Sequence, residues 1–232
     1  MIVVGILAGR GLFEMAERVV GKIAAAPQVG KVWLLTPTNR YRSADFFRRY
    51  PKIQHINSWA GPDSHDGTAI NREHLRTVMR LALANLPERP EWIWFADEDA
   101  LPADDYFALL DRIHYSEPVL LTGKTNNLDG RRWYDICTFG TDGHPFCVPY
   151  ENWDHPRWEK DLYCSGNQHL FNRAGFELNV PYPNIPGEDP HMCWAFRKAG
   201  GRLVFRPELL CTLQKQHSDA NHGYPPAYPP PV

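Results

Sequence analysis

The chain has 232 residues, of which 43% are hydrophobic and 22% are charged, and its formal net charge is -2. This length suits one domain with a sizeable core, and the near-neutral charge argues against a large nucleic-acid-binding face. The sequence has no apolar run of about 18 residues, so we expect no membrane-spanning helix. The five cysteines lack metal-type pair spacing, which favours reduced thiols and a cytoplasmic location.

Apolar runs and amphipathic stretches alternate through the first half of the chain. In chain order they predict strand 2–7, helix 12–26, strand 32–35, helix 43–49, strand 53–56, helix 68–86, strand 92–96, helix 103–114 and strand 119–121. This alternation predicts an α/β fold with a mainly parallel sheet. In such sheets ligands bind beyond the carboxyl ends of the strands.

The second half has a different character. Residues 123–165 are rich in aromatic residues, Asn, Gly and Pro and show no clear period. Helices are then predicted at 168–177 and 190–199, and a short strand at 202–205. The tail at 223–232 is proline-rich, which predicts an extended or disordered segment.

Three consecutive acidic residues follow the apolar run at 92–96. Asp97, Glu98 and Asp99 would therefore lie at the ligand-binding edge of the sheet. Side chains alternate in an extended segment, so we expect Asp97 and Asp99 to point the same way and to form a hard-oxygen site for Mn²⁺ or Mg²⁺. The alternative is a solvated turn in which an acid caps the next helix.

A Glu-Asp pair begins the helix predicted near residue 190. Asp189 is a good N-cap and Pro190 a natural first helical residue, which is explanation enough for both. A carboxylate fixed at a helix N-terminus beside a cleft could also act as general base on an acceptor hydroxyl. The sequence leaves both interpretations of Asp189 open.

The order and spacing of these segments resemble the GT-A glycosyltransferases, in particular the large inverting family 2. The resemblance covers about residues 1–217, although only the two acidic motifs are specific. It implies a single GT-A domain at 1–222, with a Rossmann-like, mainly parallel sheet. Residues 1–122 would be the nucleotide-sugar-binding half and 123–222 an irregular acceptor-binding half.

The resemblance also implies roles for individual residues. Asp97 would contact the nucleoside side of the donor, with Glu98 beside it, and Asp99 would hold the metal that bridges the diphosphate. Asp189 would be the catalytic base, and Glu188 would contact acceptor or sugar hydroxyls.

Further donor contacts would come from the loop after the first strand and from the stretch before residue 176. The residues concerned are Leu7, Ala8, Gly9, Arg10, Gly166 and Asn167. Arg10 could meet a phosphate or be an ordinary surface charge. His217 fits the place of a late metal-binding histidine in some GT-A enzymes, although a lone histidine is as often a surface or core residue.

Two segments depart from the family pattern. The acidic turn expected after the second strand is replaced by residues 36–40, Thr-Pro-Thr-Asn-Arg, and the usual Arg-Asn pair of the third helix is reversed as Asn71-Arg72. Recognition of the nucleotide base is therefore expected to be atypical.

The sequence thus predicts a metal-dependent, inverting, hexosyltransferase-like enzyme that uses a nucleotide-sugar donor. The acceptor would be a hydroxyl of a glycan, a lipid, a small molecule or a modified nucleic acid, including a hydroxylated base in phage DNA. One alternative is a nucleotidyltransferase of similar fold, in which the Glu-Asp helix has no task. Another is a non-catalytic glycan- or nucleic-acid-binding module that uses the aromatic residues of the second half.

Overall fold

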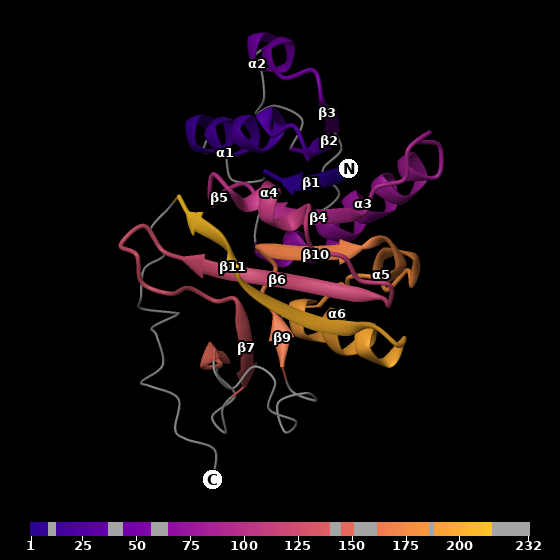
Figure 1. Cartoon of the computed structure of the whole chain (residues 1–232), viewed down its shortest axis with the longest axis vertical. Coiled ribbons are helices and arrows are strands. Elements are labelled where there is room, and N and C mark those ends of the chain that lie inside the picture. The colour runs from indigo at the N-terminus through magenta and orange to yellow at the C-terminus, as the bar shows by residue number, and fades with distance from the viewer. Residues whose placement is uncertain are drawn as a thin grey trace.

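The computed structural model describes residues 1–8, 13–36, 44–56, 65–139, 145–150, 162–185 and 188–214. An eight-stranded sheet runs through the molecule, and a three-stranded sheet lies beside one end of it (Figure 1). The strand order in the large sheet is β3-β2-β1-β4-β10-β6-β11-β5, and in the small sheet β8-β7-β9.

The large sheet consists of β1 (Ile2–Leu7), β2 (Val29–Leu35), β3 (Ile53–Ile56), β4 (Trp92–Asp97), β5 (Ala100–Pro102), β6 (Val119–Asn126), β10 (Gln168–Asn172) and β11 (Arg202–Leu213). The small sheet consists of β7 (Ile136–Phe139), β8 (Pro145–Cys147) and β9 (Tyr163–Cys164). The helices are α1 (Phe13–Ala25), α2 (Ala44–Arg49), α3 (His65–Leu83), α4 (Tyr106–Leu110), α5 (Arg173–Glu177) and α6 (Glu188–Lys198).

Strands β3, β2, β1 and β4 are parallel, as the alternating pattern predicts. Their register places Leu7 opposite both Leu35 and Asp97. The carboxyl ends of β1, β2 and β4 are therefore level with one another. This edge of the sheet carries the predicted donor loop and the acidic cluster.

The other half of the sheet is mixed. β10 runs antiparallel between β4 and β6, β6 and β11 are parallel, and β5 is antiparallel to β11. Because β10 is antiparallel to β4, it begins at the edge where β4 ends, with Gln168 opposite Ala96. The turn that precedes β10 consequently meets the acidic cluster.

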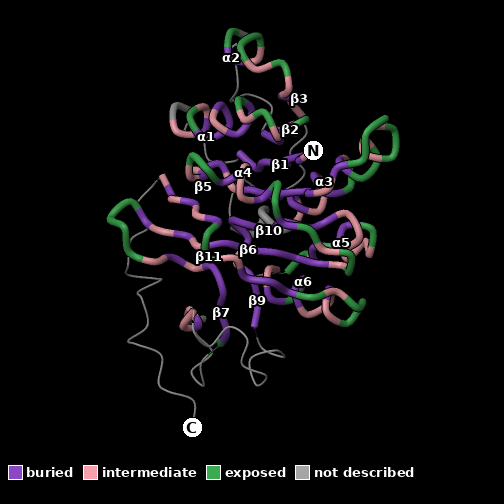
Figure 2. Tube along the Cα trace, in the orientation of Figure 1, coloured by how far each residue is buried: buried purple, intermediate pink, exposed green. Residues whose placement is uncertain are grey.

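Helices cover both faces of the sheet and create two hydrophobic clusters. On one face Val20 of α1 and Leu110 of α4 pack with Trp94, whereas on the other Leu75 of α3 and Phe196 of α6 belong to the cluster that contains Phe95. The central strands are buried along most of their length (Figure 2). Burying one such large apolar side chain stabilises the fold by about 1.5–3 kcal/mol.

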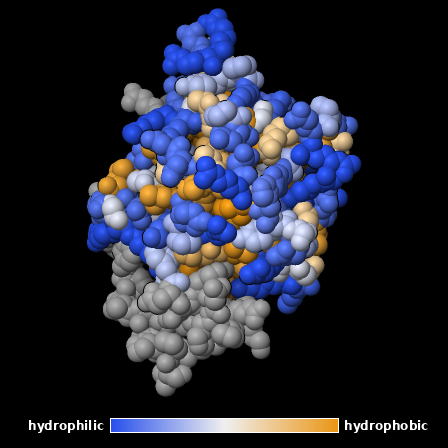
Figure 3. Space-filling view, in the orientation of Figure 1, coloured by the Kyte–Doolittle hydropathy of each residue, from blue (hydrophilic) through white to orange (hydrophobic). Residues whose placement is uncertain are grey.

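Figure 3 shows apolar residues near the middle of the molecule, whereas the outer end around α2 is hydrophilic. Among the described helices, none combines the length and the hydropathy needed to cross a membrane.

The predicted helix at 168–177 is wrong over its first half, which is the strand β10. Three buried polar side chains in this strand have partners that only the folded chain supplies. Gln168 bonds to Lys124, Thr125 and Tyr106, and Asn172 binds two carbonyls and caps α5 through the N–H of Gly175. His169 is the third, and its partners are described below. Such tertiary bonds override local helix preference.

Three further elements differ in extent. The helix predicted at 103–114 is only Tyr106–Leu110, and the strand predicted at 202–205 continues to Leu213. The pairing of β11 with β6 shifts in register between Arg206 and Leu210, which lets the strand continue past Pro207. Because a proline normally ends a strand pattern, the sequence did not indicate the full length of β11. The stretch at 123–165 contains the end of β6 and the strands of the small sheet.

Candidate active site

A single buried guanidinium joins the two acidic motifs. Arg72 lies on α3, and its side chain is 4% exposed. Its Nη2 donates to Oδ1 of Asp97 over 3.0 Å, and its Nη1 donates to Oδ1 of Asp189 over 2.6 Å and to Oε1 of Glu188 over 3.2 Å. The end of β4 and the start of α6 are therefore held together by one side chain.

The charge balance explains why this arginine can be buried. Burial by itself lowers the pKa of a guanidinium, but the negative charges of Asp189, Asp97 and Glu188 outweigh it and raise the pKa of Arg72. A buried charge is tolerated when it is paired and hydrogen-bonded in this way. Removing the arginine would leave several carboxylates close together without a counter-charge.

Both oxygens of Asp189 are held in place. Oδ1 accepts from Arg72, and Oδ2 accepts from the backbone N–H of Gly166 over 2.8 Å. The helix α6 begins at Glu188, so Asp189 lies within its first turn instead of at the predicted N-cap position. The carboxylate therefore faces α3 and the turn before β10.

Gly166 has a steric reason to be glycine. A Cβ at this position would lie 2.2 Å from Nη1 of Arg72 and 2.7 Å from Oδ1 of Asp189. The backbone approaches the charged cluster as closely as it does because no side chain intervenes.

The environment of Glu188 disfavours its charged form, although Arg72 lies within hydrogen-bonding distance. Burial and the adjacent charge of Asp189 raise its pKa, and the charge of Arg72 opposes this shift only in part. A raised carboxyl pKa in a charged cluster is a property that functional sites share.

The acidic cluster after β4 is bent. Asp97 ends the strand with its side chain 35% exposed, and Glu98 and Asp99 form a turn in which they are 7% and 4% exposed. The expectation that residues 97 and 99 alternate as in one extended segment is therefore wrong in its premise. The carbonyl of Asp99 accepts from the N–H of Gln214 over 2.8 Å, which brings the end of β11 to this turn.

The predicted metal ligands are Asp97, Asp99 and His217. Within the described ranges, no group of three or more His, Cys, Asp or Glu side chains is arranged to hold a metal ion. His217 lies outside the described residues, as do Gly9 and Arg10 of the predicted donor loop. The oxygen donors of Asp97 and Asp99 are nevertheless those that Mn²⁺ and Mg²⁺ prefer.

The other predicted donor-binding residues that the structure describes have buried side chains, so that Leu7 and Ala8 border the site mainly through their backbone. Leu7 and Ala8 are buried at 7% and 3% exposure, and the N–H of Ala8 donates to the carbonyl of Leu35. Asn167 is also buried, and its amide bonds to the carbonyl of Tyr134 and the hydroxyl of Thr125. In this structure the amide of Asn167 secures the wall of the site.

Sequence reasoning missed three members of this cluster, namely Arg72, His169 and Tyr182. In the sequence Arg72 stands out only as part of the reversed pair Asn71-Arg72. The helix α3 turns Arg72 toward the sheet edge, and its guanidinium carbon lies 5.5 Å from the ring centroid of Tyr182. Asn71 beside it is fully buried as well, and no feature of the sequence separates Arg72 from the other arginines of this helix.

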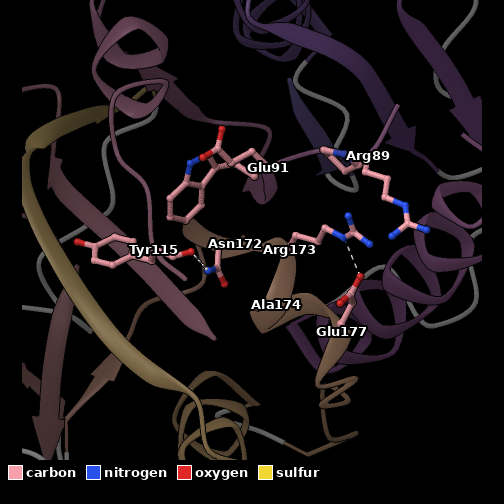
Figure 4. A pocket seen from close by; sticks show the side chains of 9 residues that line it. Arg89, Glu91, Tyr115, Asn172, Arg173, Ala174 and Glu177 are labelled. Atoms are coloured by element: carbon pink, nitrogen blue, oxygen red, sulfur yellow. Dashed lines mark hydrogen bonds and ion pairs between the residues drawn. The ribbon is translucent and has the colours of Figure 1, made fainter. Parts of the chain in front are cut away.

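A separate pocket of about 330 Å³ lies at the opposite edge of the sheet, near the start of β4 (Figure 4). Its lining includes Arg89, Trp92 and Asn172, together with the ion pair of Arg173 and Glu177. The amide of Asn172 is occupied by the carbonyls of Tyr115 and Glu117. None of the predicted site residues lines this pocket.

Solved structures of two kinds of transferase have a fold similar to that of this chain. The chain has 12% identity and a TM-score of 0.51 with residues 1–349 of TarS from S. aureus, a glycosyltransferase, covering 93% of this chain and 58% of that one. With a longer TarS structure the identity is 13% and the TM-score 0.57, covering 92% of this chain and 36% of that one. The chain therefore spans only part of the length of TarS.

Nucleotidyltransferases of similar size show the same likeness. With a 4-diphosphocytidyl-2C-methyl-D-erythritol synthase the identity is 14% and the TM-score 0.53, covering 89% of this chain and 88% of that one. The corresponding values for the enzyme from Anaerococcus prevotii are 11%, 0.53, 93% and 91%.

The chain has the GT-A-type fold. At these identities the likeness shows the fold alone. No family model matches the chain, and neither does any curated protein.

Proposed function

We propose that the chain is an inverting glycosyltransferase that moves a hexose-like sugar from a nucleoside-diphosphate sugar to an acceptor hydroxyl. The observation that carries the proposal is the convergence of Asp97, Glu188 and Asp189 on the guanidinium of Arg72. Asp97 is far in sequence from the adjacent pair Glu188 and Asp189, and the three acids belong to the two motifs on which the resemblance rests. They converge at the carboxyl edge of the sheet, which is where a donor and an acceptor would bind in this type of fold.

Asp189 is the proposed base. Its carboxylate is oriented by Gly166 and Arg72, so it is preorganised to accept the proton of an acceptor hydroxyl while the oxygen attacks the anomeric carbon. Attack from the side opposite the leaving diphosphate inverts that carbon. Glu188, one residue before, is placed to contact sugar or acceptor hydroxyls.

The donor would lie across the ends of β1 and β4. Asp97 is proposed to contact the nucleoside side, the backbone of Leu7 and Ala8 to border the nucleotide, and Gly9 and Arg10 to approach the phosphates. Asp97, Asp99 and His217 are the proposed ligands of Mn²⁺ or Mg²⁺. Bound there, the ion would supply Lewis-acid stabilisation of the leaving diphosphate.

The small sheet supports the assignment of an acceptor side. Tyr163 of β9 lies two residues before Ser165, in the turn that positions Asp189, and its ring stacks with Phe139 at 5.5 Å between centroids. Phe139 is 40% exposed. Aromatic faces of this kind pack well against sugars, which favours a glycan or glycoside among the possible acceptors.

A nucleotidyltransferase is the second candidate, because the chain matches the diphosphocytidyl-methylerythritol synthases over nearly their full length. Such an enzyme would release pyrophosphate, whereas a glycosyltransferase releases a nucleoside diphosphate. The arrangement of Asp189 and Glu188 favours the glycosyltransferase, since a nucleotidyltransferase gives this pair no evident task. A cytoplasmic location accords with the free cysteines.

The test is a two-step experiment on the purified chain. A thermal-shift screen of nucleoside diphosphates, with and without Mn²⁺, would identify the nucleotide by ligand-linked stabilisation. The matching nucleotide-sugars are then incubated with glycan, glycoside and nucleic-acid acceptors, the matching nucleoside triphosphates are incubated in parallel with phosphorylated acceptors, and the released product is measured in each case. Nucleoside diphosphate together with a glycosylated acceptor supports the proposal, and release of pyrophosphate from a nucleoside triphosphate refutes it.

A further inference from the structure

A fully buried histidine lies beneath the proposed base. His169 is in β10, opposite Phe95 of β4, and has 0% exposure. Its Nε2 lies 2.9 Å from the carbonyl oxygen of Cys164, and its Nδ1 lies 2.8 Å from the hydroxyl of Tyr182. A carbonyl can only accept, so Nε2 carries a proton, and in the neutral tautomer Nδ1 accepts from the hydroxyl of Tyr182.

This imidazole fixes one end of the turn that holds Asp189. The peptide of Cys164 is clamped on both sides, because its C=O accepts from His169 and its N–H donates to Sγ of Cys193 on α6 over 3.4 Å. Two residues further on, Gly166 donates its N–H to Asp189. The position of that N–H relative to α6 is thus set through Cys164.

The Nδ1 side of the His169 imidazole contacts Tyr182, which in turn lies beside Arg72. The rings of His169 and Tyr182 stack at 5.8 Å between centroids with an interplanar angle of 17°, and the guanidinium carbon of Arg72 lies 5.5 Å from the centroid of the Tyr182 ring. Nε2 of His169 is itself 4.0 Å from Oδ1 of Asp189. His169 therefore contacts Cys164, two residues before the Gly166 that binds Oδ2 of Asp189, and Tyr182, which lies beside the Arg72 that binds Oδ1.

We propose that His169 is a positioning residue that orients Asp189 for proton abstraction, through the Cys164 carbonyl on one side and Tyr182 on the other. This inference rests on the proposed function of Asp189. Its specific requirement is a side chain that donates at one end and accepts at the other. Phenylalanine fills a similar volume and can do neither, whereas glutamine can do both.

The test compares His169→Phe with His169→Gln in steady-state transfer assays. Phe is expected to lower kcat by about 100-fold, the typical cost of a misplaced catalytic group, with the donor KM changed little because Asp97 keeps its own bond to Arg72. Gln is expected to restore most of the loss. His114→Gln, on an exposed histidine at the other edge of the sheet, is the matched control.

Two further readouts separate this role from a loss of stability. Val204→Ala creates a core cavity away from the site and should lower the melting temperature without the fall in kcat. Nitrogen-15 NMR of the imidazole should show a neutral ring protonated at Nε2 in the wild type. A protonated Nδ1, or equal kcat for the Phe and Gln variants, would overturn the inference. If the wild type transfers no sugar, the proposed function fails instead, while the NMR result still stands.

A second inference concerns the small sheet and stands on different observations. Cys137 of β7 and Cys147 of β8 are direct partners in the antiparallel register, and their sulfur atoms lie 3.9 Å apart. The neighbouring pair is hydrogen-bonded, with the N–H of Val148 donating to the carbonyl of Ile136. The two cysteines therefore occupy a non-hydrogen-bonded pair, where Cα atoms are about 4.5 Å apart and a disulfide can be bridged.

We infer that Cys137 and Cys147 form a cross-strand disulfide by exchange with a low-molecular-weight disulfide such as glutathione disulfide. The thiolate of Cys147, which is partly exposed, attacks one glutathione sulfur and releases one glutathione thiol. The thiolate of Cys137 then displaces the second glutathione. The protein loses two electrons and two protons, which leave on two glutathione molecules.

Incubation with glutathione disulfide, followed by denaturation, alkylation and peptide mapping, tests this inference. We expect a linked Cys137–Cys147 peptide and a higher melting temperature, because the link closes a loop in the unfolded chain. Cys137→Ser should abolish both effects. A stable mixed disulfide with glutathione, a Cys164–Cys193 link in its place, or five alkylated cysteines would overturn the inference.

Discussion

Nη1 of Arg72 donates a 2.6 Å hydrogen bond to Oδ1 of Asp189, although the two residues are 117 positions apart in the sequence. The contact joins α3, in the proposed nucleotide-binding half, to α6, in the proposed acceptor-binding half. Since Nη2 of the same guanidinium binds Asp97, the proposed donor and acceptor residues share one counter-charge. The spacing between the two proposed substrates is therefore tied to a single side chain.

Arg72→Ala is expected to destabilise the protein by up to about 3 kcal/mol, the low end of the cost of breaking a buried ion pair, because the carboxylates left without a partner are partly exposed. Urea unfolding at neutral pH measures this loss. Arg72→Lys should recover only part of it, because an ammonium is a point charge and cannot span Asp97 and Asp189. Arg80→Ala, at an exposed position of the same helix, is the control and should change stability little.

Gly166→Ala is expected to reduce turnover more than stability. The new Cβ would lie within 2.7 Å of both Arg72 and Asp189, so the charged cluster must shift. A displacement of about 1 Å at a reacting group can cost about 100-fold in kcat. Gly30→Ala is the matched control, since its Cβ would meet mainly the flexible side chain of Met1. Equal kcat values for the two variants would contradict the steric account of Gly166.

The parallel half of the fold and its acidic edge were predictable from the sequence. The strand Ile2–Leu7 is an apolar run that ends before a glycine-containing stretch, and the run at 92–96 leads directly into Asp97, so hydrophobic pattern and order were enough. Strand β10 was not predictable in this way. Its polar residues gain partners only from distant segments, as when Gln168 binds Lys124 and Thr125.

The acidic residues of the candidate site were predictable from the sequence, but the arginine that pairs with them was not. Asp97 and Asp189 stand out in sequence because each follows a clear boundary of a strand or helix. Arg72 is one of several arginines on an amphipathic helix, and only the folded structure shows which of them turns toward the sheet edge. Glycine at 166 likewise has a meaning only once Arg72 and Asp189 are in place.

Glu188→Gln is expected to stabilise the protein at neutral pH by about 1 kcal/mol while lowering activity. The folded pKa of Glu188 is raised by burial and by Asp189, so between the unfolded and the folded pKa the folded chain holds more protons than the unfolded chain. Stability therefore falls as pH rises through that interval, and the ionised group remains a cost above it. Gln keeps an oxygen for Arg72 and removes that cost.

Urea unfolding of the wild type and of Glu188→Gln at several pH values checks this sign. The stability advantage of the variant should be present near neutral pH and shrink as the solution is acidified toward the ordinary pKa of a glutamate side chain, because the wild-type carboxyl is then protonated in both states. A variant less stable than the wild type at neutral pH would show that the ion pair with Arg72 outweighs the burial of the charge.

Asp189→Asn is expected to abolish transfer and to leave donor binding almost unchanged. The amide retains an oxygen for Arg72 or Gly166 and has nearly the same shape, but it cannot accept the proton of an acceptor hydroxyl. Calorimetric titration with the nucleoside diphosphate should give a similar affinity in both proteins. Normal turnover by the Asn variant would show that the base is a different group.

Asp99→Asn is expected to weaken Mn²⁺ binding and to lower transfer, while Asp189→Asn leaves the metal affinity intact. A divalent ion prefers charged carboxylate oxygens, and the amide removes one charge from the proposed ligand set. The measurement is a Mn²⁺ titration followed by activity with added chelator. Because Asp99 is only 4% exposed, a melting curve must accompany the titration, so that loss of fold is not mistaken for loss of metal. A folded Asp99→Asn variant that keeps full, chelator-insensitive activity would remove Asp99 from the metal site and leave the charge on the leaving diphosphate to Arg10 and other cationic groups.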